Sequence, residues 1–220
     1  PRRRGFLLGA GALAFSIGAG GVVRIAKAAG PDARVDFNMW LAIDPTGAIE
    51  IVFPSTEMGQ GSSTALPMIV AEELDAAWDD VRVRQLNADD RRFGNPKFGK
   101  VLYTAGSSGV QGYFEPLRLA GAQARQVLVD AAAERWGVDP RGLTTEPSAV
   151  VEPASGARLA YGEIVAGVDA APAPPDPATL RFKAREDYRL SGKPRRRSDV
   201  EAKSTGREVY GIDVDVPGMA

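Results

Sequence analysis

The sequence contains no cysteine and no histidine among its 220 residues. Without cysteine it can form no disulfide bond and supply no thiolate ligand to zinc or to an iron–sulfur cluster. Without histidine it lacks the commonest general base and metal-ligating side chain. Any metal must therefore bind through carboxylates or arrive inside a cofactor, and any proton transfer must use Asp, Glu, Lys or Tyr, or a residue of another chain.

An excess of basic charge is also missing. Lysine and arginine total 27 residues against 28 aspartates and glutamates, a net charge of −1, so nucleic acid is not expected as the main partner. The hydrophobic content of 44% with 25% charged residues predicts a packed globular body, of one large or two small domains. Because the chain starts at Pro1 and stops at Ala220 within sequence typical of folded protein, we expect a fragment or one piece of a split subunit.

The first thirty residues have the pattern of an export signal. Three arginines at residues 2–4 precede Phe6 and an apolar run, rich in Gly, Ala and Leu, that extends to Val23. Twin arginines in this position favour the twin-arginine route, which carries proteins already folded around a cofactor. The alternative is a membrane anchor, but the run contains five glycines and is short for a stable span. We therefore expect a periplasmic or exported protein, associated with the membrane if the leader is retained.

Alternating and helical patterns predict an α+β fold with mixed sheets and packed helices. Residues 35–44 and 48–53 read as two strands of a hairpin around the turn Asp44-Pro45-Thr46-Gly47. Residues 62–74 read as a helix that Ser62 or Ser63 can cap, with a start nearer Ala65 as the alternative. That later start would place Pro67 in the first turn, where proline is tolerated.

Further elements follow along the chain. The pattern predicts a strand at residues 81–86, a surface loop at 88–102, and a long helix at 116–136 that begins with Pro116 and ends before Gly137.

The C-terminal part of the chain is less regular. A hairpin is predicted at residues 149–159, a short helix at 161–168, an extended linker that is rich in Pro and Ala at 170–177, and a strand at 209–216.

Two loops of small polar residues are the strongest functional signal. Residues 54–61, Pro-Ser-Thr-Glu-Met-Gly-Gln-Gly, follow an apolar strand and precede a helix. Glycines allow the backbone to approach a ligand closely, free N–H groups at a helix start favour anionic or oxygen-rich ligands, and Gln60 can both donate and accept. Residues 104–109, Thr-Ala-Gly-Ser-Ser-Gly, also precede a helix. Two such loops predict a large polar cofactor held between them.

Several ordered motifs extend this pattern over nearly all of residues 36–220. In chain order they are residues 57–61 (Glu-Met-Gly-Gln-Gly), 64–68 (Thr-Ala-Leu-Pro-Met), 71–74 (Ala-Glu-Glu-Leu), 104–108, 115–118 (Glu-Pro-Leu-Arg), 131–138, 190–194 (Leu-Ser-Gly-Lys-Pro), 199–206, 210–213 and 217–219. Together they resemble the molybdopterin-binding subunit of the xanthine dehydrogenase and aldehyde oxidase superfamily. The nearest likeness is to the large (beta) subunit of the isoquinoline 1-oxidoreductase type and to related periplasmic aldehyde dehydrogenases.

The resemblance implies a division of the chain. Residues 1–30 would be the twin-arginine export signal, 31–169 the first part of a molybdenum cofactor-binding domain, 170–185 a linker, and 186–220 the start of an α/β hammerhead domain.

It also implies roles for the two loops. The family's glutamine at the position of Gln60 hydrogen-bonds an oxo ligand of molybdenum, and the flanking glycines let the main chain approach the metal centre. The loop at 104–108 contacts the pterin or its phosphate. No residue is expected to ligate the metal directly, and at Gly109 relatives commonly carry a different residue. The cofactor-binding residues are expected to be Gly59, Gly61, Thr64, Ala105, Gly106, Ser107 and Ser108.

The implied activity is hydroxylation of an aldehyde or an N-heteroaromatic compound with water-derived oxygen. The implied cofactor is molybdopterin, as the cytosine dinucleotide, carrying molybdenum. The implied partners are an iron–sulfur small subunit, a cytochrome c and the rest of the large subunit. The family's general base, a glutamate, would lie beyond residue 220, so neither Glu57 nor Glu115 is assigned that role. The alternative is a non-catalytic exported binding or structural domain.

Other conspicuous residues favour structural interpretations. Trp40, Trp78 and Trp136 suit the core or its rim. The run Arg195-Arg196-Arg197 suits a solvated surface. Glu72 and Glu73 are expected on a helix surface, one of them paired with a basic residue.

Overall fold

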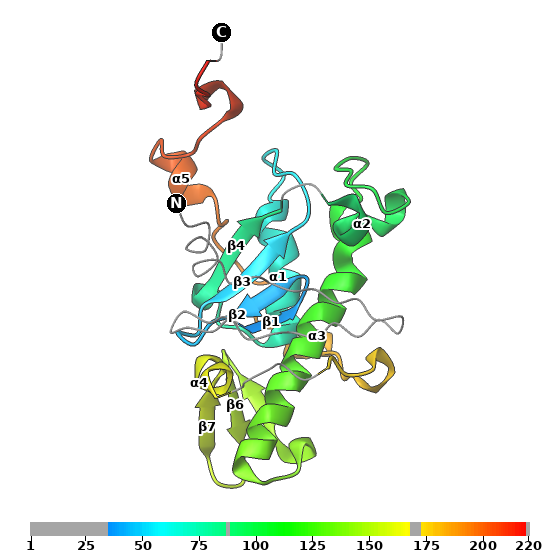
Figure 1. The fold of residues 1–220 in the computed structure, drawn as a ribbon, viewed down its shortest axis with the longest axis vertical. Helices are drawn as coiled ribbons and strands as arrows, with labels where there is room; N and C mark the ends of the chain where they lie inside the picture. Colours follow the sequence, from blue (N-terminus) through cyan, green and yellow to red (C-terminus); the bar gives the residue numbers. More distant parts are fainter. Residues whose placement is uncertain (1–34, 87–88, 168–172, 219–220) are drawn as a thin grey trace, which may run out of the picture.

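The computed structural model describes residues 35–86, 89–167 and 173–218. These residues form a four-stranded sheet in the order β1-β2-β3-β4 and a three-stranded sheet in the order β5-β6-β7, with two packed helices, α1 and α3 (Figure 1). The predicted α+β class with mixed sheets is therefore confirmed. The predicted export signal, residues 1–30, lies outside the described residues.

The first sheet is mixed. Strand β2 (Leu41–Ile43) pairs antiparallel with β1 (Val35–Asn38) and with β3 (Ile49–Phe53), and β3 pairs parallel with β4 (Val81–Gln85). The predicted hairpin between β2 and β3 is confirmed, but the prediction of a single strand over 35–44 is wrong. The side chain of Asn38 accepts hydrogen bonds from the backbone N–H groups of Trp40 and Leu41, which turns the chain back on itself.

Helix α1 (Ser62–Leu74) connects β3 to β4, as a crossover between parallel strands requires. The alternative start near Ala65 is wrong, because the helix begins at Ser62 and Pro67 lies inside it. Proline has no N–H to donate to the carbonyl of Ser63, four residues earlier. That carbonyl instead accepts a hydrogen bond from the Ser198 hydroxyl at 3.4 Å. A distant segment thus compensates for the missing helical bond.

Helix α3 (Gly109–Trp136) is the longest element, with 28 residues, and it packs against α1. The prediction that it begins at Pro116 is wrong. Its first turns are part of the folded body, since Tyr113 is buried and donates to the carbonyls of Pro54 and Phe93. The predicted end before Gly137 is confirmed, with that glycine at a φ of +69°.

The second sheet is antiparallel and lies beside α4 (Tyr161–Ala166), at the lower end of the molecule in Figure 1. The predicted hairpin at 149–159 and the short helix after it are confirmed, while β5 has too little alternation to be predicted. The predicted surface loop at 88–102 contains the short α2, and its residue Asn95 is fully buried. The remaining elements are η1 (Trp78–Asp80), α2 (Asp90–Phe93), η2 (Pro96–Phe98), η3 (Pro140–Gly142), β5 (Thr144–Glu146), β6 (Ala149–Glu152), β7 (Ala157–Ala160), η4 (Pro177–Thr179), η5 (Arg185–Asp187), α5 (Val200–Ser204) and η6 (Gly211–Asp213).

The strand predicted at residues 209–216 is not formed. This stretch contains η6, belongs to neither sheet of the described residues, and exposes Val209 and Ile212, the latter by 94%. A strand needs a neighbour for its backbone N–H and C=O groups, and local alternation cannot provide one. Part of the predicted linker, residues 168–172, lies outside the described residues. Among the helices of the three described ranges, α3 included, none combines the length and hydropathy that a bilayer crossing needs.

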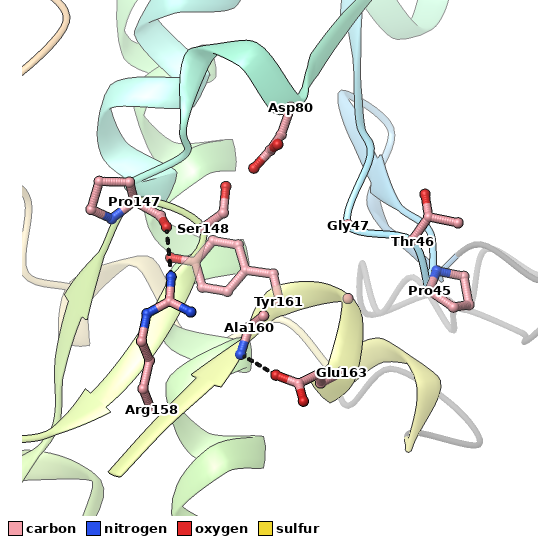
Figure 2. A pocket seen from close by; sticks show the side chains of 11 residues that line it. Pro45, Thr46, Gly47, Asp80, Pro147, Ser148, Arg158, Ala160, Tyr161 and Glu163 are labelled. Carbon is pink, nitrogen blue, oxygen red and sulfur yellow. Dashed lines mark hydrogen bonds between the residues drawn. The ribbon is translucent and has the colours of Figure 1, made fainter. Parts of the chain in front are cut away.

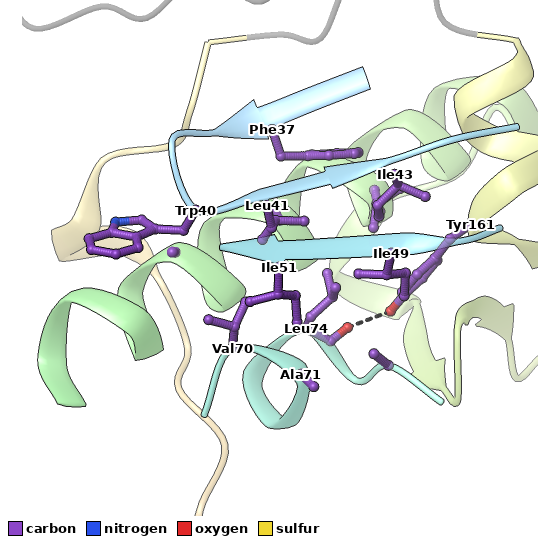
Figure 3. Packing of buried hydrophobic residues seen from close by; sticks show 14 of the residues in the cluster. Phe37, Trp40, Leu41, Ile43, Ile49, Ile51, Val70, Ala71, Leu74 and Tyr161 are labelled. Carbon is purple, nitrogen blue, oxygen red and sulfur yellow. Dashed lines mark hydrogen bonds between the residues drawn. The ribbon is translucent and has the colours of Figure 1, made fainter. Parts of the chain in front are cut away.

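The core lies between the first sheet and the helices α1 and α3, as Figure 3 shows. Ile43, Ile49 and Ile51 are fully buried and face Leu74 of α1. The hydroxyl of Tyr161 donates to the Leu74 carbonyl at 2.6 Å, which ties α4 to α1. The loops that leave β3 and precede α3 therefore start from a rigid base.

The tryptophans occupy the predicted structural places. Trp40 is buried in the core, with its ring edge-to-face against Phe93 at 4.9 Å between centroids. Trp78 and Trp136 pack partly buried at the rim of the same cluster.

Candidate functional site

The two glycine-containing loops meet. We call residues 54–61 the first glycine loop and residues 104–108 the second glycine loop. The hydroxyl oxygens of Ser55 and Thr104 lie 2.9 Å apart, and the N–H of Thr56 donates to the Thr104 hydroxyl at 3.1 Å. Both loops lie at the upper end of the molecule in Figure 1, beyond the end of β3 and at the start of α3. Two segments about fifty residues apart thus form one surface.

Neighbouring elements hold the base of the first glycine loop. The side-chain amide of Gln85, at the end of β4, donates to the Ser55 carbonyl at 2.9 Å. Tyr113 of α3 donates to the Pro54 carbonyl at 3.2 Å. The position of this loop is therefore set by a parallel strand and a helix that local sequence does not reveal.

The carboxylate of Glu57 organises the interior of the first glycine loop. It accepts hydrogen bonds from the N–H groups of Gly59 at 2.8 Å, Gly61 at 2.9 Å and Ser63 at 2.8 Å. It thereby caps α1, and the prediction of a Ser62 or Ser63 side-chain cap is wrong. The positive φ angles of Gly59 and Gly61, +102° and +83°, allow the chain to curl around this carboxylate. Because a negative charge already lies at the start of α1, these three amides are not available to an anionic ligand.

Glu57 is ionised over the whole neutral range. Partial burial raises the pKa of its carboxyl group, but the hydrogen bonds from the Ser63, Gly61 and Gly59 amides outweigh that effect and lower the pKa to about 2.

The pH dependence of stability provides a test of this arrangement. A carboxyl group whose pKa is lowered by folding stabilises the folded state above its unfolded pKa, and the stabilisation is lost as the pH falls through the folded value. We expect Glu57→Gln to flatten the loss of stability between about pH 4.5 and pH 2, measured by urea unfolding at a series of pH values. Glu134→Gln, on the exposed side of α3, is the matched control and should keep the full slope. An unchanged slope in Glu57→Gln would contradict the assignment.

Gln60 lies exposed on the first glycine loop, with its side chain folded back onto that loop. Its Nε2 donates to the Thr56 carbonyl at 2.6 Å and to the Ser62 hydroxyl at 2.7 Å, and its Oε1 accepts from the Met58 N–H. Its backbone N–H has no acceptor within the three described ranges. In this conformation the backbone N–H is free for a ligand, whereas the side-chain amide must exchange one of its two donor bonds to reach one.

The second glycine loop presents some of its predicted residues and turns others inward. Gly106 and Ser107 are exposed, with φ angles of +60° and +53°. Ala105 is half-buried, and its carbonyl accepts the hydrogen bond of the buried Ser108 hydroxyl at 2.8 Å. Gly106 and Ser107 are thus the groups that this loop offers to a ligand.

Thr64, the remaining predicted contact, faces a different part of the chain. It is buried on the first turns of α1, and its hydroxyl accepts the N–H of Ser198 at 2.9 Å. The structure therefore separates Thr64 from the exposed edge of the loops and places it against the C-terminal segment.

Arg197 is the residue that sequence reasoning missed. Its guanidinium donates to the Gly59 carbonyl at 2.7 Å and to the Glu57 carboxylate at 3.2 Å. The prediction that residues 195–197 form a solvated run is wrong for this member. No local pattern could have identified it, because its partners lie 138 and 140 residues earlier in the chain.

A row of buried carboxylates on α1 holds the segment that carries Arg197. We call residues 183–199 the C-terminal strap. Glu72 accepts the N–H groups of Arg189, Leu190 and Ser191 at 2.9, 2.8 and 2.7 Å. Burial raises the pKa of the Glu72 carboxyl, but these N–H groups outweigh burial and lower it. Asp75, after the end of α1, forms ion pairs with Lys183 and Arg189 of the strap.

Glu73 is the most deeply buried of these carboxylates. It is bound by Arg118 of α3 at 2.7 and 2.5 Å and accepts the Lys183 N–H at 3.0 Å. With Glu72 and Glu73 only 3% and 1% exposed, the prediction that they lie on a helix surface is wrong. Their roles are structural, since they fix the strap along α1.

The donor set of the two loops suits a ligand that carries its own metal ligands. Over the described ranges, no three or more Asp, Glu, His or Cys residues gather in a way that could hold a metal ion. The loops offer backbone N–H groups, one carboxamide and hydroxyls, which are hydrogen-bonding groups rather than metal ligands.

A separate cavity of about 230 Å³ opens between the turn at residues 45–47 and the second sheet with α4 (Figure 2). It lies at the other end of β3 from the first glycine loop. Its polar groups are used internally: Arg158 donates to the Pro147 carbonyl at 3.5 Å, and Glu163 accepts the Ala160 N–H at 2.8 Å. It therefore does not belong to the surface formed by the loops.

Comparisons with known proteins agree with this geometry. The model of a molybdopterin cofactor-binding domain matches residues 4–216. The beta subunit of isoquinoline 1-oxidoreductase from Brevundimonas diminuta is 40% identical over 99% of this chain and 32% of its own length. A membrane-bound aldehyde dehydrogenase (pyrroloquinoline-quinone) of Gluconacetobacter polyoxogenes is 34% identical over 99% of this chain and 28% of its length. A nicotinate dehydrogenase subunit of Pseudomonas putida is 33% identical over 89% and 16%. The chain thus spans about a third or less of these relatives.

Solved structures give a weaker likeness. Quinoline 2-oxidoreductase from Pseudomonas putida 86 matches 57% of this chain and 15% of its own chain, with a TM-score of 0.44 and 21% identity.

Proposed function

This chain belongs to the molybdopterin cofactor-binding domain family, and from that premise we propose that it is part of the cofactor-binding subunit of a molybdenum hydroxylase. The substrates would be aldehydes or N-heteroaromatic compounds, in keeping with the names of the similar proteins from Brevundimonas, Gluconacetobacter and Pseudomonas. Because the chain spans about a third or less of those proteins, it would supply part of a cofactor site and not a complete enzyme.

The observation that carries this proposal is the contact between the two glycine loops. The 2.9 Å approach of the Ser55 and Thr104 hydroxyls brings together the two segments that carry the family motifs. Loops packed at opposite ends of the fold would have ruled out a shared ligand.

The residues of the two loops fit the proposed group. The backbone N–H of Gln60 is free within the described ranges, and a methyl group at Gly59 would meet no atom within 4 Å, so the main chain there is open to a ligand. On the second glycine loop, Gly106 and Ser107 would bind the pterin or its phosphate. When bound, the cofactor would supply the redox chemistry that inserts a water-derived oxygen atom into a C–H bond. The loop residues would bind and orient it.

Neither glutamate near the loops is free to act as the general base. Glu57 is committed to three backbone N–H groups and to Arg197, with a pKa of about 2. A general base at neutral pH needs a pKa nearer 7. We therefore place the base on a part of the protein beyond residue 220.

The finer features of the proposal follow from the family. The pterin would be the cytosine dinucleotide form. Electrons would leave through iron–sulfur clusters on a small partner subunit and then a cytochrome c. The arginine-containing leader would direct export of the folded protein to the periplasm. Cofactor analysis of the purified assembly, and the location of the protein in fractionated cells, test these points.

Replacing Gln60 with alanine tests the central assignment. We expect kcat of the assembled enzyme with an aromatic aldehyde to fall about tenfold, because one orienting hydrogen-bonding group is lost. Molybdenum content, measured by mass spectrometry, should stay close to that of the unaltered enzyme. Gln126→Ala, on the exposed side of α3, is the control and should change neither quantity. Full turnover in a molybdenum-replete Gln60→Ala enzyme would refute the role of Gln60.

A second candidate is a domain without molybdenum. It is favoured by the Gln60 side chain, whose amide is bonded within its own loop. The name of the Gluconacetobacter relative also specifies a quinone cofactor. An assembly that lacks molybdenum and contains a quinone would support a quinone enzyme. An assembly that lacks both would support a non-catalytic binding or structural domain.

A further inference from the structure

We propose that Arg197 is a positioning residue that holds the first glycine loop, and with it Gln60, in the conformation that receives the cofactor. This inference rests on the proposed function, but the contact it describes can be tested independently of that function.

The guanidinium of Arg197 joins three groups at once. It donates to the Gly59 carbonyl at 2.7 Å and to the Glu57 carboxylate at 3.2 Å. Asp199 accepts from its Nε at 2.9 Å and from its Nη2 at 2.6 Å, which fixes the plane of the guanidinium. A planar group with five donors can satisfy such an arrangement, whereas a lysine ammonium cannot span it.

The Gly59 carbonyl is the informative partner, because it belongs to the same peptide unit as the N–H of Gln60. A trans peptide is planar, and its C=O and N–H point in opposite directions. Fixing the carbonyl toward Arg197 therefore fixes the Gln60 N–H on the opposite side, where it has no acceptor within the described ranges. Without Arg197, this peptide unit next to a glycine could rotate readily.

The C-terminal strap delivers Arg197 in a defined position. Ser198 donates its N–H to the Thr64 hydroxyl at 2.9 Å and its hydroxyl to the Ser63 carbonyl at 3.4 Å. Farther along the strap, Glu72 holds Leu190 and Ser191 against α1. Thr64, predicted as a cofactor contact, thus acts one step away, by anchoring the residue next to Arg197.

Hydrogen exchange of the assembled enzyme tests the contact directly. We expect backbone amides in residues 55–64 to exchange about three- to tenfold faster in Arg197→Met, since a charge-assisted hydrogen bond to the loop is lost. Arg197→Lys should give an intermediate rate. Arg196→Met, at the exposed neighbouring position, should leave the rate unchanged. Equal rates in Arg197→Met and the unaltered protein would overturn the proposal.

A second readout follows the cofactor. In molybdenum-replete Arg197→Met we expect an altered electron paramagnetic resonance spectrum of reduced molybdenum and a lower kcat with little change in KM. A merely structural role would lower the yield of assembled enzyme and leave the spectrum of the assembled fraction unchanged, which would contradict a positioning role. If the unaltered assembly lacks molybdenum, the proposed function fails, whereas the exchange result still decides whether Arg197 holds the loop.

If Arg197→Met does not assemble, Asp199→Asn decides the question. This variant keeps Arg197 but weakens the charge that orients its guanidinium. Faster exchange confined to residues 55–64 would support the proposal, and unchanged exchange there would overturn it.

Discussion

Replacing Glu73 with alanine is expected to lower the free energy of unfolding by about 3–5 kcal/mol, the usual cost of removing one partner from a buried ion pair. The Glu73 side chain is 1% exposed, and those of Arg118 and Arg125 are 19% and 16% exposed. Arg118 binds it at 2.7 and 2.5 Å, and Arg125 lies 3.7 Å away. The substitution would leave two largely buried guanidinium groups without their shared carboxylate.

The electrostatics of Arg125 support this expectation. Burial lowers the pKa of its guanidinium, and the carboxylate of Glu73 acts in the opposite direction by stabilising the charged form. Glu73 also accepts the Lys183 N–H, so its loss would release the start of the C-terminal strap.

Urea unfolding, followed by the fluorescence of the buried Trp40, measures the effect. Glu134→Ala, an exposed glutamate on α3, is the matched control, and a change within about 0.5 kcal/mol is expected there. Glu73→Gln should cost less than Glu73→Ala, because it keeps an acceptor for the Lys183 N–H. Equal stability of Glu73→Ala and Glu134→Ala would refute the buried network.

Replacing Gly121 with alanine is expected to destabilise the protein by about 2–3 kcal/mol. Gly121 lies where α3 crosses α1, and a methyl group there would lie 2.5 Å from the Val70 carbonyl oxygen and 3.1 Å from the Leu74 nitrogen. Both contacts involve backbone atoms of α1, which cannot move aside as a flexible side chain could. The two helices would have to separate, which would disturb the core and the Glu73 contact together.

Gly109→Ala on the same helix is the control for this substitution. A methyl group at Gly109 would meet no atom within 4 Å. Alanine is favoured over glycine in helices by about 0.5–1 kcal/mol, so this variant should be unchanged or slightly more stable. Thermal unfolding of the two variants separates close helix packing from helix propensity. A Gly121→Ala protein as stable as Gly109→Ala would contradict the close approach of α1 and α3.

Local pattern was sufficient where an element depends on its own residues. The hairpin of β2 and β3, the span of α1, strand β4 and the end of α3 before Gly137 all follow from alternation, helical spacing and turn chemistry. The glycine-containing loops were recognisable for the same reason, because their composition is unusual over a few consecutive residues.

Local pattern failed where tertiary contacts override local preference. Pro67 and Pro116 suit helix starts, yet both lie inside helices because neighbouring segments hold the turns that precede them. Residues 209–216 alternate like a strand but remain irregular, since no strand of the described residues lies beside them.

What the sequence determined by itself is the chemistry of the site: two small-residue loops with one carboxamide, and no histidine or cysteine to hold a metal. What only the tertiary structure decided is how those loops are held. The burial of Glu72 and Glu73, the capping of α1 by Glu57 and the reach of Arg197 to Gly59 all join residues far apart in the chain or reverse their usual exposure. Charged side chains carry no periodic signal for such pairing, because the free energy of burying them depends on partners that only the folded chain brings near.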